Sequence, residues 1–247
     1  MGSDNRLDVD AMLAALEAAP KGDVVLLHAC CHNPTGFDLS HDDWRRLLKV
    51  VRSRDLLPLI DFAYQGFGDG LEQDAWSTRL FAAELPEVLI TSSCSKNFGL
   101  YRDRTGALIV CAKTADKLVD IRSQLANIAR NLWSTPPDHG AAVVATILGD
   151  PQLKSLWADE VETMRLRIAQ LRSGLVEALE PHGLRERFAH IGVQRGMFSY
   201  TGLTPEQVKK LRDQHSVYMV GTGRANVAGI DASRLDLLAE AIADVCR

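Results

Sequence analysis

The stretch Val88–Cys111, VLITSSCSKNFGLYRDRTGALIVC, contains two short apolar runs separated by a polar loop. The runs Val88–Thr91 and Ala107–Cys111 are rich in Val, Ile and Leu without polar alternation, which is typical of strands buried on both faces. The loop between them is at the short limit for a helical crossover, so we expect the second strand to run antiparallel to the first. Within the loop, Lys96 stands among serines and is followed by Arg104.

Two further apolar runs precede this stretch, at Val24–Ala29 and Leu57–Ile60. Segments with helical spacing separate the runs, one after Ser40 and one over Ala75–Glu84. Ser40 and Asp43 form a capping-box pattern at the start of the first helix. The alternation of strands and helices predicts an α/β domain with a mostly parallel sheet.

The second half of the chain has a different pattern. A helical period covers Thr114–Leu132, and a long helix is predicted from Asp150-Pro151 to near residue 182, closed by Gly183. Its length suits a connection between two domains, which we place at residues 1–162 and 163–247.

The second predicted domain is small and of the α+β type. Its predicted strands lie in RGMFSYTG (195–202) and SVYMV (216–220). A helix capped by Thr204 separates them, and an amphipathic helix closes the chain.

Composition excludes several classes of protein. The chain has 247 residues, of which 46% are hydrophobic and 24% charged, as in ordinary globular proteins. A net charge of −4 lacks the basic excess of nucleic-acid binding. The apolar runs are too short to cross a membrane, and the polar N-terminus is not a secretory signal. The five cysteines lack metal-site spacing, so we expect reduced thiols, no metal and a cytoplasmic location.

Ligands of open α/β sheets bind beyond the carboxyl ends of the strands. The residues that follow the first three strands include one amide, one carboxylate, one phenol, one amine and an anion cradle: Asn33, Asp61, Tyr64, Ser93, Ser95, Lys96 and Arg104. Pyridoxal phosphate needs such groups, because its aldehyde requires a lysine and its ring nitrogen a carboxylate. Its phosphate suits hydroxyls and a guanidinium. We interpret His28, His32 and His139 as structural.

The motifs HNPTG, DFAYQGF and SKNFGLYRDRTG, in this order, resemble the class I aminotransferases of the aspartate and aromatic amino-acid group. The resemblance continues through IARNLWSTPPDHGAAVVATIL, RGMFSYTGL and GRANVAG, and so covers nearly the whole chain. It implies the pyridoxal-phosphate aminotransferase fold with a partial large domain and a small C-terminal domain.

The same resemblance implies a role for each candidate residue. Lys96 would form the Schiff base, Asp61 would hold the pyridine nitrogen, and Tyr64 and Asn33 would hold the phenolic oxygen. Ser93, Ser95 and Arg104 would bind the phosphate. Arg224 would bind the substrate α-carboxylate, and Arg130 would recognise a dicarboxylate side chain across the interface of a homodimer.

The implied reaction moves an amino group between aspartate or an aromatic amino acid and a 2-oxo acid such as 2-oxoglutarate. The resemblance starts in the middle of the family's sequence, so we expect a C-terminal portion that binds cofactor weakly and turns over slowly. Two alternatives stay open: a pyridoxal-phosphate lyase of the same fold, which would not need Arg130, and a non-catalytic fragment.

Overall fold

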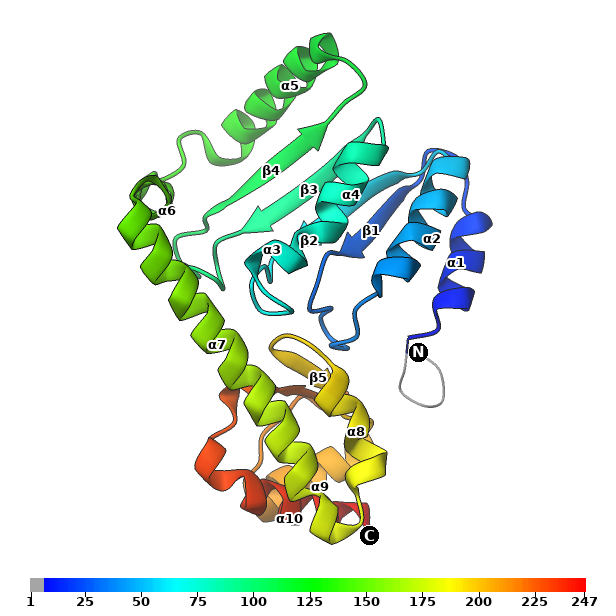
Figure 1. The fold of residues 1–247 in the computed structure, drawn as a ribbon, viewed down its shortest axis with the longest axis vertical. Helices are drawn as coiled ribbons and strands as arrows, with labels where there is room; N and C mark the ends of the chain where they lie inside the picture. The colour runs from blue at the N-terminus through cyan, green and yellow to red at the C-terminus, as the bar shows by residue number, and fades with distance from the viewer. Residues whose placement is uncertain (1–6) are drawn as a thin grey trace.

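A four-stranded sheet forms the centre of the larger part of the molecule (Figure 1). Its order is β1 (Val24–His28), β2 (Leu57–Phe62), β3 (Val88–Ser93) and β4 (Gly106–Cys111). The first three strands are parallel and β4 is antiparallel to β3, which confirms the predicted parallel sheet and the predicted antiparallel strand.

The computed structural model describes residues 7–247. The predictions for Met1–Arg6 lie outside this range.

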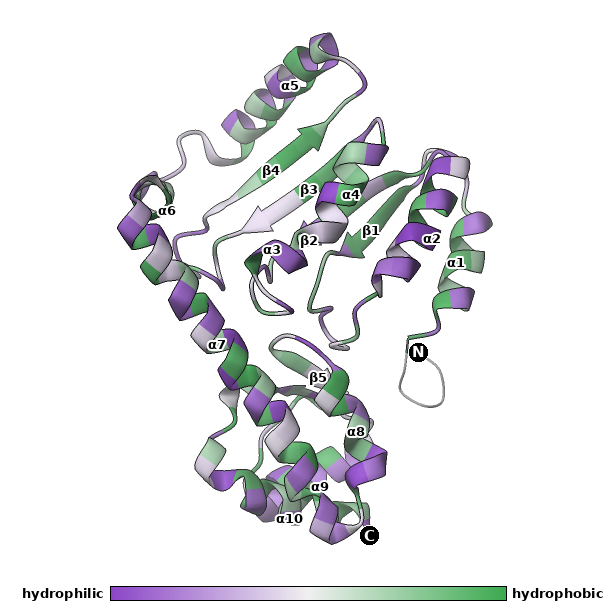
Figure 2. Ribbon diagram, viewed as in Figure 1, coloured by the Kyte–Doolittle hydropathy of each residue, from purple (hydrophilic) through white to green (hydrophobic). Residues whose placement is uncertain are grey.

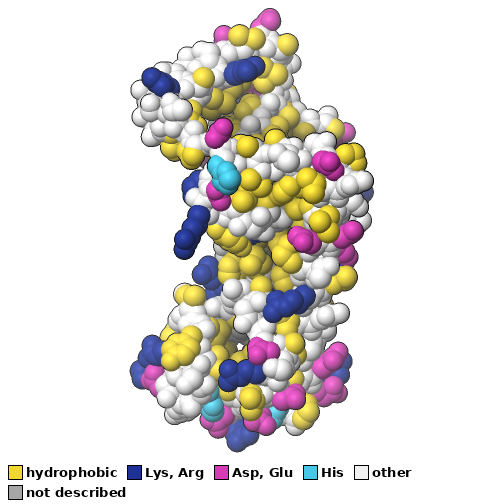
Figure 3. All heavy atoms as spheres, turned by 90° about the vertical axis from the view of Figure 1, so that its left-hand side faces the viewer, with side chains coloured by type: hydrophobic (Ala, Val, Ile, Leu, Met, Phe, Trp, Pro, Cys, Tyr) yellow, Lys and Arg dark blue, Asp and Glu magenta, His cyan; other side chains and the backbone are white. Residues whose placement is uncertain are grey.

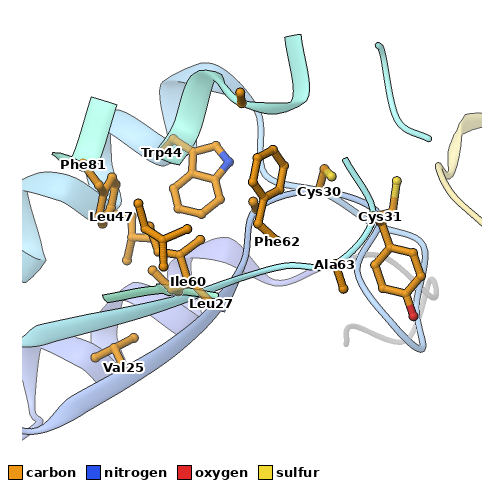
Figure 4. Packing of buried hydrophobic residues seen from close by; sticks show 14 of the residues in the cluster. Val25, Leu27, Cys30, Cys31, Trp44, Leu47, Ile60, Phe62, Ala63 and Phe81 are labelled. Atoms are coloured by element: carbon orange, nitrogen blue, oxygen red, sulfur yellow. The ribbon is translucent and has the colours of Figure 1, made fainter. Parts of the chain in front are cut away.

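One face of the sheet is covered by helices α1 (Val9–Glu17), α2 (His41–Ser53), α3 (Leu71–Asp74) and α4 (Trp76–Glu84). Ser40 caps α2 through the predicted capping box with Asp43. Trp44 packs edge-on against Phe81 at 5.3 Å between ring centroids, directly above Ile60 of β2 (Figure 4). These apolar contacts form the main core and fix the helices on the sheet.

The opposite face of the sheet is bare. Along β1, Val25 and Leu27 are buried, whereas Val24 and Leu26 are 57% and 63% exposed. The prediction that these strands are buried on both faces is therefore wrong for β1, and likewise for β4, which has no buried residue. No helix within residues 7–247 covers this face, and its apolar strands stand out in Figure 2.

Helix α5 (Ala115–Trp133), which follows β4, has no buried residue either. Its apolar side chains include the 67% exposed Leu132 and the 62% exposed Trp133. Figure 3 shows hydrophobic side chains gathered on this side of the molecule, mainly at its mid-height.

Helix α6 (His139–Gly149) leads into α7 (Pro151–Ala178), which links the two parts of the molecule (Figure 1). Asp150 caps α7 as predicted, by accepting from the amides of Gln152 and Leu153. The helix ends before residue 182, because Pro181 has no N–H to continue it, and a short 3-10 helix follows at Glu180–His182. Gly183 has the predicted left-handed conformation. None of the described helices is long and apolar enough to cross a membrane.

The smaller part surrounds a second apolar cluster that includes Leu175, Leu179 and Leu211. Its elements are α8 (Arg185–Val193), β5 (Phe198–Tyr200), α9 (Pro205–His215), β6 (Arg224–Asn226), α10 (Leu235–Cys246) and short 3-10 helices at Val227–Gly229 and Ala232–Arg234. This confirms the small α+β unit. The division at residues 162 and 163 stays a prediction.

The predicted strand at 216–220 is wrong, because β5 pairs with β6 instead. Ser216 ends α9 in the left-handed region, and the Val217 amide donates back to Leu211. At the other end, the Val220 amide donates to Arg224. These local hydrogen bonds replace a strand pairing.

Candidate functional site

The residues predicted to converge lie at one edge of the larger sheet. Asp61 is near the end of β2, opposite His28 of β1 and Thr91 of β3 in the strand register. Its Oδ1 accepts a hydrogen bond from the Ala63 amide at 3.0 Å, which turns the chain toward Tyr64. The parallel order of the strands thus brings their polar carboxyl ends to the same edge.

Tyr64 is the centre of this group. Its side chain is buried, and the Nζ of Lys96 lies 4.5 Å from its ring centroid. The Asn33 amide donates to the Tyr64 hydroxyl at 3.4 Å. Burial raises the pKa of the Tyr64 phenol, and the Asn33 hydrogen bond partly opposes that rise. The neutral phenol therefore persists beside the lysine.

Arg224, at the start of β6, brings the smaller part of the molecule to the same place. Its Nη1 donates to Asn33 Oδ1 at 3.3 Å, and its guanidinium lies 4.9 Å from the ring centroid of Phe198. The Phe198 ring also meets Tyr64 edge-on at 6.5 Å. Sequence reasoning missed Phe198, although the alternation of Phe198, Ser199 and Tyr200 along the predicted strand was the available signal.

The predicted anion cradle is partly assembled. Ser93 Oγ donates to Ser95 Oγ at 3.0 Å and accepts from the Ser95 amide at 3.1 Å. Arg104 follows in the same hairpin, but its exposed guanidinium donates to the Tyr101 carbonyl at 2.9 Å. Across residues 7–247, no hydrogen bond joins that guanidinium to either serine. The two hydroxyls are thus in place, and the arginine lies nearby in sequence without touching them.

Arg130 is not brought to the other candidates. It lies near the end of α5, is exposed, and its carbonyl accepts from the Ser134 amide. Its side chain forms no hydrogen bond or ion pair with another candidate in the described part of the chain. Its predicted role stays a prediction.

The loop that carries Lys96 is held from α7. Trp157 Nε1 donates to the Asn97 carbonyl at 2.7 Å, and its ring stacks on Phe98 with centroids 4.5 Å apart. Asn97 is buried, and its Oδ1 has no partner among the described residues. No local pattern indicated that Trp157, 61 residues beyond Lys96, would hold the loop of that lysine.

A second polar cluster is formed by Cys30, Cys31 and Asp74, whose ligand-type atoms lie within 4.8 Å of one another. The hydrogen bond with Cys31, together with burial, raises the pKa of Cys30 well above its usual value. Both oxygens of Asp74 already accept backbone amides. We therefore interpret this cluster as structural. All five cysteines are free, and Cys30 and Cys31 are buried, as predicted for that pair.

The donor set at the sheet edge fits pyridoxal phosphate. It has an amine on Lys96 for an aldehyde, a carboxylate on Asp61 for a ring nitrogen and paired hydroxyls on Ser93 and Ser95 for a phosphate. Tyr64 and Asn33 offer donors for a phenolic oxygen. Arg224, from β6 of the smaller part, reaches this edge through Asn33 and offers a guanidinium for a substrate carboxylate.

Comparison with known proteins agrees with this assignment. The family model "Aminotransferase class I and II" matches residues 2–242. An aromatic-amino-acid aminotransferase of Pseudomonas aeruginosa is 78% identical over 246 residues, which are 100% of this chain and 62% of that protein. An aspartate aminotransferase of Escherichia coli is 46% identical over 242 residues, covering 98% of this chain and 61% of that protein.

Solved structures show the same relationship. The aromatic-amino-acid aminotransferase from Burkholderia pseudomallei, covalently bound to pyridoxal phosphate, aligns with a TM-score of 0.96 at 46% identity. That alignment covers 98% of this chain and 61% of the other. The chain thus spans less than two thirds of the length of the relatives it matches.

Proposed function

Because this chain belongs to the class I and II aminotransferase family, we propose that its site is that of a pyridoxal-phosphate-dependent transaminase. The observation that supports this most is a continuous set of contacts across the sheet edge. Lys96 meets the Tyr64 ring, Tyr64 meets Asn33, and Asn33 meets Arg224. An amine and a carboxylate-binding arginine are thereby held on either side of a phenol and an amide.

We assign the cofactor contacts to residues of this edge. Pyridoxal phosphate supplies an aldehyde that condenses with amino groups and a ring that withdraws electrons. Asp61 would hold the ring nitrogen, and Tyr64 with Asn33 the phenolic oxygen. The phosphate would lie on Ser93 and Ser95, with Arg104 turned toward it.

Lys96 and Arg224 would act on the substrate. The guanidinium of Arg224 would bind the α-carboxylate through two parallel hydrogen bonds, which fixes the direction of the Cα–H bond. Lys96 would accept and return the Cα proton as general base and acid. Asn33 contacts both Tyr64 and Arg224, so it would hold the cofactor-binding and substrate-binding groups in fixed positions relative to one another.

The proposed substrates are aspartate or an aromatic amino acid with a 2-oxo acid such as 2-oxoglutarate, since the named relatives include both kinds of enzyme. We further propose a cytoplasmic homodimer. In it, Arg130 would recognise a dicarboxylate side chain in the site of the other copy, because it joins no candidate residue within its own described chain.

Cofactor titration of the purified chain tests the assignment of Lys96. Adding pyridoxal phosphate should produce a visible absorbance band, and borohydride reduction followed by peptide mass spectrometry should place the added mass on Lys96. The matched control is Lys113→Ala, which removes an exposed lysine paired with Glu87 at 3.6 Å. It should leave the band unchanged, whereas an intact band in Lys96→Ala would refute the assignment.

The reaction itself needs a separate assay. Incubation with aspartate and 2-oxoglutarate should yield glutamate, at a low rate for this chain. Cofactor binding without glutamate would favour the lyase reading, and absence of both would favour a non-catalytic fragment.

A further inference from the structure

A buried guanidinium lies next to the candidate site without belonging to it. Arg172, on α7, is 2% exposed. None of its contacts within the described residues is an ion pair. Its three nitrogens donate instead to the backbone carbonyls of Ile191, Arg195, Gly196 and Phe198. They also donate to the Ser199 hydroxyl and to the side-chain oxygen of Gln194.

Holding this charge inside the protein is unfavourable by itself. Burial lowers the pKa of Arg172 to about 10, so the group stays charged at neutral pH but has lost much of its hydration. Carbonyl dipoles replace the water, and the planar fork of five N–H donors is needed to reach them all. A lysine has the charge but not the fork.

The oxygens bound by Arg172 all belong to the segment that ends α8 and begins β5. The shortest contacts are Nη2 to the Phe198 carbonyl and Nη1 to Ser199 Oγ, both at 2.6 Å, and Nη2 to the Gly196 carbonyl at 2.7 Å. Arg172 therefore fixes the backbone on both sides of Phe198.

Phe198 is the link between this guanidinium and the site. Its ring contacts Tyr64 on one side and the Arg224 guanidinium on the other. β5 and β6 also pair Tyr200 with Arg224, so a shift of β5 moves Arg224 directly.

We propose that Arg172 is a positioning residue, which holds Phe198 and β5 so that the Arg224 guanidinium faces Asn33 and an incoming carboxylate. The proposal rests on the proposed role of Arg224 as the carboxylate-binding residue.

Arg167 provides a matched control on the same helix. It also donates to backbone carbonyls, those of Ala228 at 3.0 Å and Ile230 at 3.2 Å, but it is exposed and touches neither Phe198 nor Arg224. Loss of Arg167 therefore removes a comparable helix-to-loop contact in which no residue of β5 takes part.

The first measurement is the binding of 3-(4-fluorophenyl)propionate to the chain loaded with pyridoxal phosphate, followed by fluorine NMR. Arg172→Met and Arg172→Lys should each weaken binding roughly tenfold, as for loss of one well-aligned charged hydrogen bond. Arg167→Met should bind as the parent does. In the double variant Arg172→Met/Phe198→Leu, the loss of affinity should be smaller than the sum of the two single losses, because both changes act in part through one ring.

Equal affinity in Arg172→Met, Arg167→Met and the parent would overturn the proposal. Additive losses in the double variant would also overturn it, since they would show that Arg172 does not act through Phe198. A different result tests the proposed function: unchanged binding in Arg224→Met would refute the role of Arg224.

Amide hydrogen exchange tests the positioning role without ligand or cofactor. In Arg172→Lys, which keeps the buried charge, amides of β5 and β6 should exchange faster while those of α10 keep their protection. Unchanged protection in β5 and β6 would overturn the proposal, as would a uniform loss over the whole chain, which indicates a global role.

Discussion

Replacing Asp74 tests how the loop that carries Tyr64 is built. The carboxylate of Asp74 is buried and accepts three backbone amides, those of Gly66 at 2.8 Å, Gly68 at 3.0 Å and Asp69 at 2.8 Å. No other acceptor of these amides is recorded within residues 7–247. The Asp74 carboxylate is thus the acceptor for three amides of the loop from Tyr64 to Asp69, and Asp74→Ala leaves these three amides unpaired.

The size of the effect follows from which amides can reach water. Asp69 is exposed and its amide can hydrate, whereas Gly66 and Gly68 are buried. Two orphaned buried donors cost about 2–6 kcal/mol, at 1–3 kcal/mol each. Asp74→Asn keeps one oxygen, which can accept both buried amides as Oδ2 does, so we expect it to lose only about 1 kcal/mol.

Urea unfolding measures these losses. With a slope of about 2 kcal/mol/M, a loss of 2 kcal/mol lowers the midpoint by about 1 M without changing the slope. The matched control is Glu72→Gln on the same short helix, which removes an exposed ion pair with Arg79 at 2.7 Å and costs at most about 1 kcal/mol. A midpoint for Asp74→Ala equal to that of Glu72→Gln would refute the reasoning.

The pH dependence gives a second check on Asp74. Burial raises the pKa of its carboxyl, against the opposing effect of the three amides, so the folded state holds this proton more tightly than the unfolded state. The resulting stabilisation is complete below the unfolded pKa of about 3.9 and is lost as pH rises through the folded pKa. The gap in unfolding free energy between the parent and Asp74→Asn should therefore narrow from acid to neutral pH. A gap that widens would contradict this.

Three further outcomes are expected. Trp157→Phe removes the hydrogen bond to Asn97 and should cost about 1 kcal/mol in urea unfolding, together with faster amide exchange in the Lys96 loop. Ser40→Ala removes the α2 cap and should lower the free energy of unfolding by about 1 kcal/mol. An unchanged urea midpoint would show that the capping box does not stabilise the fold. Burial lowers the pKa of His190, so the thermal midpoint should fall as pH drops through that pKa, and less steeply in His190→Gln.

Features with a local cause were predictable from the sequence. The capping boxes at Ser40 and Thr204 are both present, because the side chains and amides of two residues within a stretch of four decide each of them. The antiparallel pairing of β3 with β4 followed from the short connection. The convergence of Asn33, Asp61 and Lys96 followed from strand order, since parallel strands share one carboxyl edge.

Features that depend on distant partners were not predictable in this way. SVYMV has strand composition, but β5 pairs with Arg224–Asn226, and pairing rather than composition decides a strand. Arg172 follows Leu171 on α7, and its acceptors lie 19 to 27 residues away, with no local signal. Arg104 is an exception, because its acceptor, the Tyr101 carbonyl, is only three residues away.

The bare face of the sheet has a calorimetric consequence. Val24, Leu26 and the apolar residues of β4 are already hydrated in the native state, so unfolding exposes little more of them to water. The heat capacity of unfolding, which is about 12–15 cal/mol/K per residue for well-covered domains, should accordingly be lower here. A smaller heat capacity reduces the curvature of stability against temperature, because the heat-capacity term subtracts less from the enthalpic gain below the melting point. For the same melting point and enthalpy of unfolding, this chain should therefore gain more stability than a fully covered domain when it is cooled to room temperature.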